Sequence, residues 1–217
     1  MAKQYRAVRT RQELIRSAAE VFDDVGFADS SISAISSRAG VSTGALHFHF
    51  GNKQALGSAV ELAAAQTLLR ITGHVPLRDP APLQHLVDTS HTLAGYLLGD
   101  RVLRAGFRLG SDPAWRGGGD LWEQWQDWVQ LMLVVAREQG GLSPEIDVED
   151  VVYAVTGALA GFEVRARRDP EWGAGEVITR FWRLMLPRLA GERVMDTLVP
   201  GGTRGDVCPL EEGWGVA

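Results

Sequence analysis

Apolar residues recur at helical spacing along most of this chain, and no stretch alternates between apolar and polar residues for long enough to predict a strand. The first apolar stripe falls at i, i+4, i+7, i+8 and i+11 of a helix over about residues 6–25. It consists of Leu14, Ala18, Val21, Phe22 and Val25. Gly26 is expected to end this helix. The whole pattern predicts an all-α protein of about nine helices.

Residues 31–50 have the pattern of two short helices joined by a tight turn. Ser31 is a good N-cap for the first helix, and Ser42 is a good N-cap for the second. Gly40 between them can adopt the left-handed conformation that ends a helix. Apolar residues at helical spacing define the inner side of the two helices: Ile32, Ile35, Ala39, Ala45, Leu46 and Phe48. Such a helix-turn-helix is typical of proteins that place a recognition helix in the major groove of DNA.

The rest of the chain is predicted to be helical, with glycine and proline residues at the breaks. Further helices are expected near 53–72, 82–98, 101–111, 119–139, 147–168 and 174–190. Residues 1–53 would then form a small three-helix DNA-binding domain, and 54–193 a larger helical domain. Residues 194–217 are rich in glycine and proline without periodicity, so we expect a flexible tail.

The composition is that of a folded globular protein, with 217 residues, 45% hydrophobic and 23% charged. No apolar run approaches the roughly 20 residues needed to span a bilayer, and the basic N-terminus lacks the apolar core of a secretory signal. Cys208 is the single cysteine and has no partner within the chain, which favours the cytoplasm. We therefore expect a cytoplasmic protein with no membrane partner.

The net charge of −5 is unevenly distributed. Residues 1–60 hold seven Lys/Arg and five Asp/Glu, a net charge of +2, and the remainder carries −7. A basic end on an acidic body limits contact with a polyanion such as DNA to that end. The small excess also predicts modest nonspecific affinity that salt weakens.

Several segments together resemble the tetracycline-repressor (TetR) family of ligand-controlled repressors. They are an arginine-rich first helix, the helix-turn-helix at 31–50 and the run AGVSTGALHFHFGNK at 39–53. Within that family the chain is most similar to the γ-butyrolactone autoregulator receptors of Streptomyces-like bacteria. That similarity rests on MAKQ at 1–4 with Arg6-Ala and Arg9-Thr-Arg, GALHFHF at 44–50 and LRAGFRL at 103–109. The resemblance implies a homodimeric repressor of antibiotic or secondary-metabolite genes, released from a palindromic operator by a γ-butyrolactone-like signal.

The resemblance also implies which residues bind DNA. Major-groove contacts would come from Thr43, Gly44 and His47, and phosphate contacts from Arg6, Thr10, Ser31, His49 and Lys53. Ser42 and Phe48 complete the DNA-binding set. The family usually has Lys where Thr43 stands and Tyr where His47 stands. Losing the fixed charge at Thr43 implies a shifted operator preference or weaker binding.

The effector site is expected in the C-terminal helices. Trp122, Trp125 and Trp128 recur every three residues, and an indole ring with one N–H suits a mostly apolar ligand that carries a carbonyl. By resemblance Trp125 is the first candidate. The other candidates are Phe107, Trp128, Met132, Val155, Thr156 and Phe162. Ala64 replaces a glutamine that those receptors often have in the pocket, so a related receptor for a butenolide, a furan or an antibiotic stays open.

The last two helices have wider apolar faces than one partner helix covers, which predicts a dimer formed through a four-helix bundle. The expected interface residues are Val152, Leu159, Ile178, Phe181, Trp182 and Met185. The resemblance places the family's dimer in the same region.

No metal or cofactor is expected. His47 and His49 are two residues apart on a helix and point roughly 200° apart, so they cannot chelate one ion together. We interpret His85, Asp88 and His91 as a solvated helix face. No phosphate loop, nucleophile elbow or metal-binding cluster is present, so we expect no enzyme. A helical enzyme without a recognisable motif, or a protein-interaction module, stays a distant alternative.

Overall fold

The computed structural model describes residues 2–73, 79–173 and 175–203, and over these ranges the chain is helical with no strand. The ten α-helices are α1 (Ala2–Asp29), α2 (Ile32–Arg38), α3 (Thr43–His49), α4 (Lys53–Thr72), α5 (Pro82–Gly99), α6 (Arg101–Gly110), α7 (Leu121–Glu138), α8 (Val148–Ala166), α9 (Gly175–Leu189) and α10 (Glu192–Met195). A short 3₁₀-helix, η1 (Pro170–Gly173), follows α8. The predicted all-α class is confirmed. None of the described helices is both long and apolar enough to cross a bilayer.

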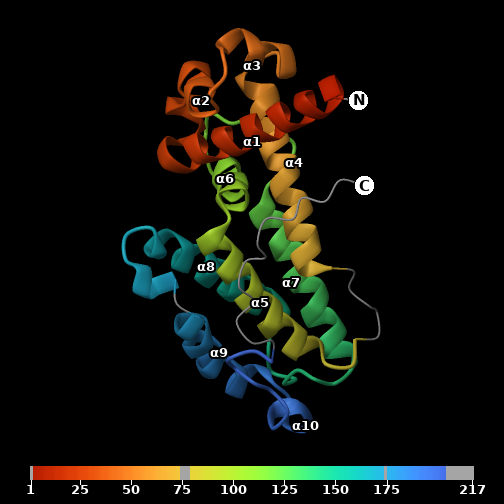
Figure 1. The fold of residues 1–217 in the computed structure, drawn as a ribbon. Coiled ribbons are helices and arrows are strands. Elements are labelled where there is room, and N and C mark those ends of the chain that lie inside the picture. Colours follow the sequence, from red (N-terminus) through yellow and green to blue (C-terminus); the bar gives the residue numbers. More distant parts are fainter. Residues whose placement is uncertain (1, 74–78, 174, 204–217) are drawn as a thin grey trace. The chain divides into compact units, whose positions relative to one another are not determined.

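The chain divides into two compact units, shown as a ribbon in Figure 1. The first comprises Met1–Leu68 and Asp100–Gln124, and the second Leu69–Gly99 and Trp125–Ala217. The first unit therefore contains α6 as well as α1–α3 and most of α4. This division follows contacts rather than roles, so the functional boundary expected at residue 53 stays a prediction.

In the first unit, α1, α2, α3, α4 and α6 share one apolar core. Both predicted caps are present, because Ser31 accepts a hydrogen bond from the Ala34 N–H and Ser42 accepts one from the Ala45 N–H, each at 3.1 Å. Gly26 has φ +85° and interrupts α1, which resumes for three residues beyond it. The break that the sequence predicts at Gly26 is therefore real, although a last turn follows it. Val25, expected in the apolar stripe, is 48% exposed.

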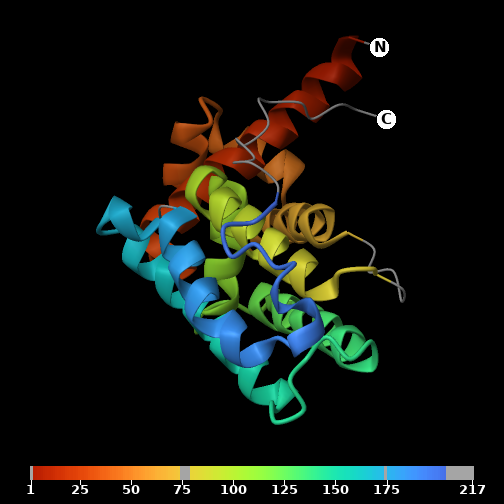
Figure 2. The same ribbon diagram turned by 90° about the horizontal axis from the view of Figure 1, so that it is seen from below.

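In the second unit, α5 packs against both α8 and α9. The interior side of these helices is apolar, and several of its residues are almost fully inaccessible to solvent: Leu86, Leu93, Val152, Val155, Leu159, Ile178 and Trp182. After α10 the chain returns across α5, as the blue segment in Figure 2 shows. A flexible tail from residue 194 is thus wrong for residues 194–203, because residues 194 and 195 end α10 and hydrogen bonds hold Val199 and Thr203 on α5. Residues 204–217, including Cys208, lie outside the described residues.

Candidate nucleic-acid interface and ligand site

The outer face of α3 is formed by Thr43, Gly44, His47 and Phe48, all of which are exposed. Phe48 is 84% exposed, so the prediction that it packs inward is wrong. Phe50 fills the core in its place at 4% exposure. The Phe48 ring packs edge-on against the His49 ring at a centroid distance of 5.4 Å. Its exposure supports its place in the predicted DNA-binding set.

One ring nitrogen of His47 contacts the protein backbone. Its Nδ1 lies 3.1 Å from the carbonyl oxygen of Gly51. Because a carbonyl can only accept, this contact assigns the proton to Nδ1. The other ring nitrogen, Nε2, has no hydrogen bond to the protein among the contacts of the described residues, and the exposed His47 ring can present it to DNA.

Lys53 is held by the fold. Its Nζ donates to the carbonyl oxygens of Phe27 at 2.8 Å, Ala28 at 3.3 Å and Ser30 at 2.9 Å, and lies 4.5 Å from the centroid of the Phe27 ring. An ammonium group has three donors, and all three have acceptors here. Lys53 therefore binds the protein's own backbone in this structure and not the phosphate that the sequence predicts. We assign it to the scaffold of the α1–α2 corner.

The same corner is held from the other side by Asp112, which the sequence did not point to. Its Oδ2 accepts from the N–H groups of Phe27 at 2.8 Å and Ala28 at 3.3 Å. Burial raises the pKa of Asp112, but hydrogen bonds from the backbone N–H groups of residues 114, 28 and 27 and the charge of Arg108 outweigh it, and the pKa is lowered from 3.8. Asp112 therefore acts as a cap for the last turn of α1.

Trp115 completes this corner from the loop after α6. Its ring meets the Phe27 ring edge-on at a centroid distance of 4.8 Å, and its Nε1 donates to Glu61 Oε1 at 3.0 Å. The ring lies against Gly57, where an added Cβ would approach Trp115 Cζ3 to 2.3 Å. Only glycine allows α4 to receive this ring.

The segment LRAGFRL at 103–109, which supports the subfamily resemblance, contributes arginines to the first unit. Arg104 donates to the Asp23 carboxylate from Nε at 3.0 Å and from Nη2 at 2.9 Å. Arg108 donates to the backbone carbonyl of Asp23. These bonds hold α6 on α1, so this segment shapes the part of the molecule that carries the helix-turn-helix. Phe107, a ligand candidate, is buried in the first unit and packs on Trp122 at 4.4 Å.

The remaining predicted phosphate contacts lie at the surface. Arg6, Ser31 and Ser42 are exposed, and His49 and Thr10 are half-buried. The Thr10 hydroxyl donates its one hydrogen to the carbonyl oxygen of Arg6 at 2.9 Å, so a hydrogen bond from Thr10 to a phosphate oxygen would have to replace this bond. Ser31 and Ser42 are occupied as caps but can still donate their hydroxyl hydrogens.

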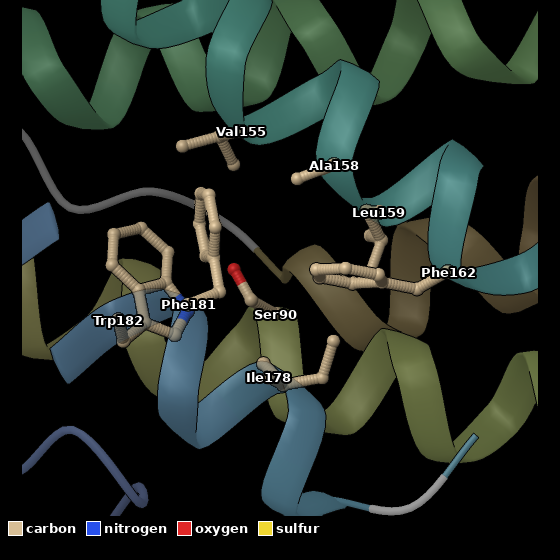
Figure 3. Close-up of a pocket in the computed structure, with 8 residues that line it drawn as sticks. All are labelled: Ser90, Val155, Ala158, Leu159, Phe162, Ile178, Phe181 and Trp182. Carbon is tan, nitrogen blue, oxygen red and sulfur yellow. The ribbon is translucent and has the colours of Figure 1, made fainter. Parts of the chain in front are cut away.

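A shallow hollow lies between α5, α8 and α9 in the second unit; it has about 190 Å³ of empty space when the part open to solvent is included. Its lining side chains converge in Figure 3: Ser90, Val155, Ala158, Leu159, Phe162, Ile178, Phe181 and Trp182. Two of them, Val155 and Phe162, are predicted ligand residues. Four others, Leu159, Ile178, Phe181 and Trp182, were predicted to face a dimer partner.

Buried polar atoms without partners mark the interior of the second unit. Among the described residues there are four: Trp125 Nε1, Trp128 Nε1, Trp182 Nε1 and Thr156 Oγ1. Trp125 and Trp128 stack at a centroid distance of 5.1 Å, and Trp125 is fully buried. Buried polar groups in proteins are normally hydrogen-bonded, and leaving one unpaired costs about 1–3 kcal/mol. All four groups can donate a hydrogen bond to an acceptor. Only Trp182 lines the hollow, whereas Trp125, Trp128 and Thr156 do not.

The predicted dimer residues are mostly interior. Val152, Leu159, Ile178 and Trp182 are between 0% and 4% exposed within one chain, so the prediction that they face a partner is wrong. Within the same chain, α5 packs on both α8 and α9. Phe181 and Met185 remain half-buried. The exposed apolar residues of α8 and α9 are instead Tyr153, Val164 and Leu184.

The candidate face of His85, Asp88 and His91 is not a solvated one. Asp88 is 8% exposed and accepts from Thr203, His85 Nδ1 lies 2.6 Å from Asp79 Oδ2, and His91 Nε2 lies 3.0 Å from the Pro200 carbonyl oxygen. Each of the three has a different partner. Over the ranges that the structure describes, no group of three His, Cys, Asp or Glu side chains could hold a metal ion.

Known proteins resemble this chain in sequence. A family model of bacterial regulatory proteins, tetR family, matches residues 14–60, which run from α1 into α4. The A-factor receptor protein of Streptomyces griseus is 33% identical over 205 residues, covering 93% of this chain and 71% of that protein.

Solved structures resemble it in fold. A gamma-butyrolactone receptor (ArpA-like protein) is similar with a TM-score of 0.72 at 25% identity, over 89% of this chain and 93% of that chain. The TetR family protein CprB from S. coelicolor A3(2) gives a TM-score of 0.75 at 26% identity, over 87% of this chain and 93% of that chain. The helix-turn-helix matches the family model, and the A-factor receptor is 33% identical over 93% of this chain. The chain therefore belongs to the tetR family of bacterial regulatory proteins.

Proposed function

We propose that this protein is a homodimeric transcriptional repressor, working in the cytoplasm, that leaves its operator when an uncharged γ-butyrolactone-like molecule binds the second unit. The relatives support this, since they include an A-factor receptor and a gamma-butyrolactone receptor. The regulated genes would be those of antibiotic or other secondary metabolism. A related receptor for a butenolide or an antibiotic is the second candidate, because Ala64 departs from those receptors.

The recognition surface is the outer face of α3. Thr43 and His47 offer a hydroxyl and a ring nitrogen to base edges, and Gly44 allows close approach of the backbone. Phe48 adds an exposed ring suited to the methyl group of thymine. Arg6 and His49 would contact phosphates and fix the register. Two such heads on a palindromic operator would add the energies of two half-sites.

One observation carries the effector proposal: the unpaired N–H and O–H groups in the apolar second unit. An indole N–H can only donate, so the complementary ligand offers acceptors such as a lactone carbonyl or ring oxygen. No lysine or arginine is among the buried residues of this unit's described part. A buried carboxylate without a cation is costly, so the inventory favours a neutral lactone over a furan carboxylic acid.

The dimer surface follows from what one chain leaves exposed. Tyr153, Gly157, Gly161 and Val164 lie at i, i+4, i+8 and i+11 on one exposed stripe of α8, and Leu184 is 75% exposed on α9. Added Cβ atoms at Gly157 and Gly161 would meet nothing within 4 Å. We assign this stripe, with the half-buried Phe181 and Met185, to the second copy.

The proposal is tested with a matched pair of ligands. An operator is first selected from random duplex DNA by the full-length protein, and its complex is then titrated with a 2-acyl-γ-butyrolactone and with the hydroxy acid formed by opening the same lactone ring. Fluorescence anisotropy of the labelled duplex should fall with the lactone and stay constant with the hydroxy acid, because only the latter is charged.

Thr156→Val tests the contribution of one buried donor, since it removes one unpaired hydroxyl and keeps the side-chain shape. It should bind the operator as the wild type does and require about tenfold more lactone for release, the equivalent of one hydrogen bond of roughly 1.4 kcal/mol. Release by the hydroxy acid at equal or lower concentration would contradict the proposed ligand class. Failure to select any duplex would contradict the proposed function as a whole.

A further inference from the structure

A polar stripe runs along α5 where an interior helix would be expected to be apolar. Gln84, Asp88 and His91 lie at i, i+4 and i+7, and both Gln84 and Asp88 are 8% exposed. These side chains belong neither to the proposed DNA-binding surface nor to the buried donors proposed to bind the ligand. Burying a carboxylate is costly without several donors, so the stripe needs partners.

The partners are the backbone and one side chain of residues 196–203, here called the strap. The amide of Gln84 pairs with both backbone groups of Val199, because Oε1 accepts from its N–H at 2.7 Å and Nε2 donates to its carbonyl at 3.2 Å. The same Nε2 also donates to Asp88 Oδ1 at 2.8 Å. A side-chain amide thus binds the strap as a neighbouring strand would, without depending on the identity of residue 199.

Asp88 binds the end of the strap. It accepts from the Thr203 N–H at 2.8 Å and from the Thr203 hydroxyl. Gly202 has φ +82°, a conformation that glycine adopts at low cost, and this turn brings Thr203 back to the carboxylate. His91 Nε2 lies 3.0 Å from the Pro200 carbonyl oxygen between these points. Each side chain of the stripe therefore binds a different residue of the strap.

The strap also passes close to α9 while it is bound to α5. A Cβ added to Gly201 would lie 3.8 Å from Thr179 Oγ1. The neighbouring residue Ile178 lines the hollow, and so does Ser90, two residues after Asp88 (Figure 3). Positions two apart on a helix point roughly 200° apart, so the strap lies on the outer side of α5 and the hollow on its inner side.

We propose that residues 196–203 are a clasp that limits the opening of the effector hollow, with Asp88 as the positioning residue that fastens it. The enclosed room in the hollow is about 10 Å³, no more than a single water molecule needs, whereas pockets for small ligands run to roughly 300–1,000 Å³. A ligand must therefore move α5 and α9 apart. The strap connects these two helices, because it follows α9 and α10 in the chain and is hydrogen-bonded to α5. This inference rests on the proposed function, in that the ligand entering the hollow is the effector.

The strap can leave α5 without leaving Asp88 unpaired. Asp88 is bound by the strap on one side and by Gln84 on the other, and when the strap leaves, water can replace the two Thr203 donors. The clasp thus has a docked and a released state that differ by a few hydrogen bonds. A ligand that needs a wide hollow favours the released state, because it binds that state better.

The test compares two truncations of the full chain, one ending at Met195 and one ending at Thr203. The first lacks the strap, and the second keeps it and lacks only residues 204–217. Backbone hydrogen exchange over α5 and α9 should be at least tenfold faster in the first chain than in the second. A 2-acyl-γ-butyrolactone should also bind and dissociate at least tenfold faster from the first chain, with a smaller change in affinity. Equal exchange in the two chains would overturn the clasp.

Point variants keep the test decisive if the shorter chain does not fold. Asp88→Ala should raise exchange as the truncation does. Asp88→Asn should restore slow exchange, because its amide oxygen accepts from the Thr203 N–H while its amide N–H group donates to the Thr203 hydroxyl oxygen. Adding Asp88→Ala to the strapless chain should change nothing further, whereas a purely structural carboxylate would add its own effect.

The two proposals fail separately. Strap-dependent exchange without lactone binding in any chain would reject the effector and support the clasp. Lactone release of the operator with identical kinetics in both truncated chains would support the effector and reject the clasp.

Discussion

At the corner between α1 and α2, two charged side chains replace the hydrogen bonds that the helix loses at Gly26. Asp112 accepts from the N–H groups of Phe27 and Ala28, and Lys53 donates to the carbonyl oxygens of residues 27, 28 and 30. An anion at the N–H groups and a cation at the carbonyl groups each satisfy the local dipoles. The direction in which the chain enters the helix-turn-helix is therefore set by side chains from two other elements.

Removing Asp112 should destabilise the protein in a pH-dependent way. Because its folded pKa lies below 3.8, its contribution is complete well above that value and is lost as the pH falls through the folded pKa. Asp112→Ala should lower the free energy of unfolding by about 1–3 kcal/mol at pH 7. The difference from the wild type should shrink below about pH 4.

Urea unfolding followed by circular dichroism at several pH values measures this difference. Asp127→Ala, at an exposed position of α7, is the control and should change the free energy of unfolding by less than about 0.5 kcal/mol. A loss for Asp112→Ala that stays constant down to pH 3 would show that packing, not the carboxylate charge, holds the corner.

Residue roles were predictable from the sequence where one local interaction decides them. The caps Ser31 and Ser42 act within three residues of themselves, and both predictions are confirmed. The resemblance predicts that Lys53 binds phosphate. A lysine beside a recognition helix can bind either a phosphate or backbone carbonyl oxygens, and the sequence does not distinguish the two roles. The difference lies in Phe27, 26 residues away, and no local pattern reports it.

At the scale of helices, glycine and proline breaks gave most of the boundaries, because helix ends are local events. What they could not give is which helix covers which face. The apolar faces of α8 and α9 looked wide enough for a second copy, but Val152 and Ile178 are buried within one chain, where α5 packs on both helices. The strap was missed for the same reason, since its bonds to Asp88 span 115 residues.

The fit between α4 and the loop after α6 gives a prediction for one helical glycine. A methyl group at Gly57 would lie 2.3 Å from Trp115 Cζ3, so Gly57→Ala must displace the ring and its bond to Glu61. Helix propensity alone would favour alanine by about 1 kcal/mol, but overpacking costs about 1–3 kcal/mol. We expect a net loss of about 1–2 kcal/mol, measured by urea unfolding.

Gly95→Ala in α5 is the matched control, because an added Cβ there meets nothing within 4 Å. It should raise the free energy of unfolding by up to about 1 kcal/mol. If both variants stabilise the protein, Trp115 does not depend on the space that Gly57 leaves.

At the scale of the whole molecule, operator binding requires two recognition helices. One α3 presents only four outward positions, too few for specific binding by a single half-site. The stripe on α8 and Leu184 on α9 are apolar, and in a single chain they are exposed to solvent. A second copy covering that stripe would supply both the burial and the second head.

Leu184→Arg should therefore separate the copies and weaken DNA binding together. At 75% exposure Leu184 carries little of the chain's own core, so the variant should fold with an unchanged circular dichroism spectrum. Sedimentation velocity should show a monomer at concentrations where the wild type is a dimer, and affinity for the selected operator should fall at least 100-fold because the two half-site energies no longer add. Leu62→Arg, on α4 at 59% exposure, introduces the same charge and should leave both measurements unchanged. A dimeric Leu184→Arg protein would place the interface elsewhere, whereas a monomer that binds the operator at wild-type affinity would reject the need for two heads.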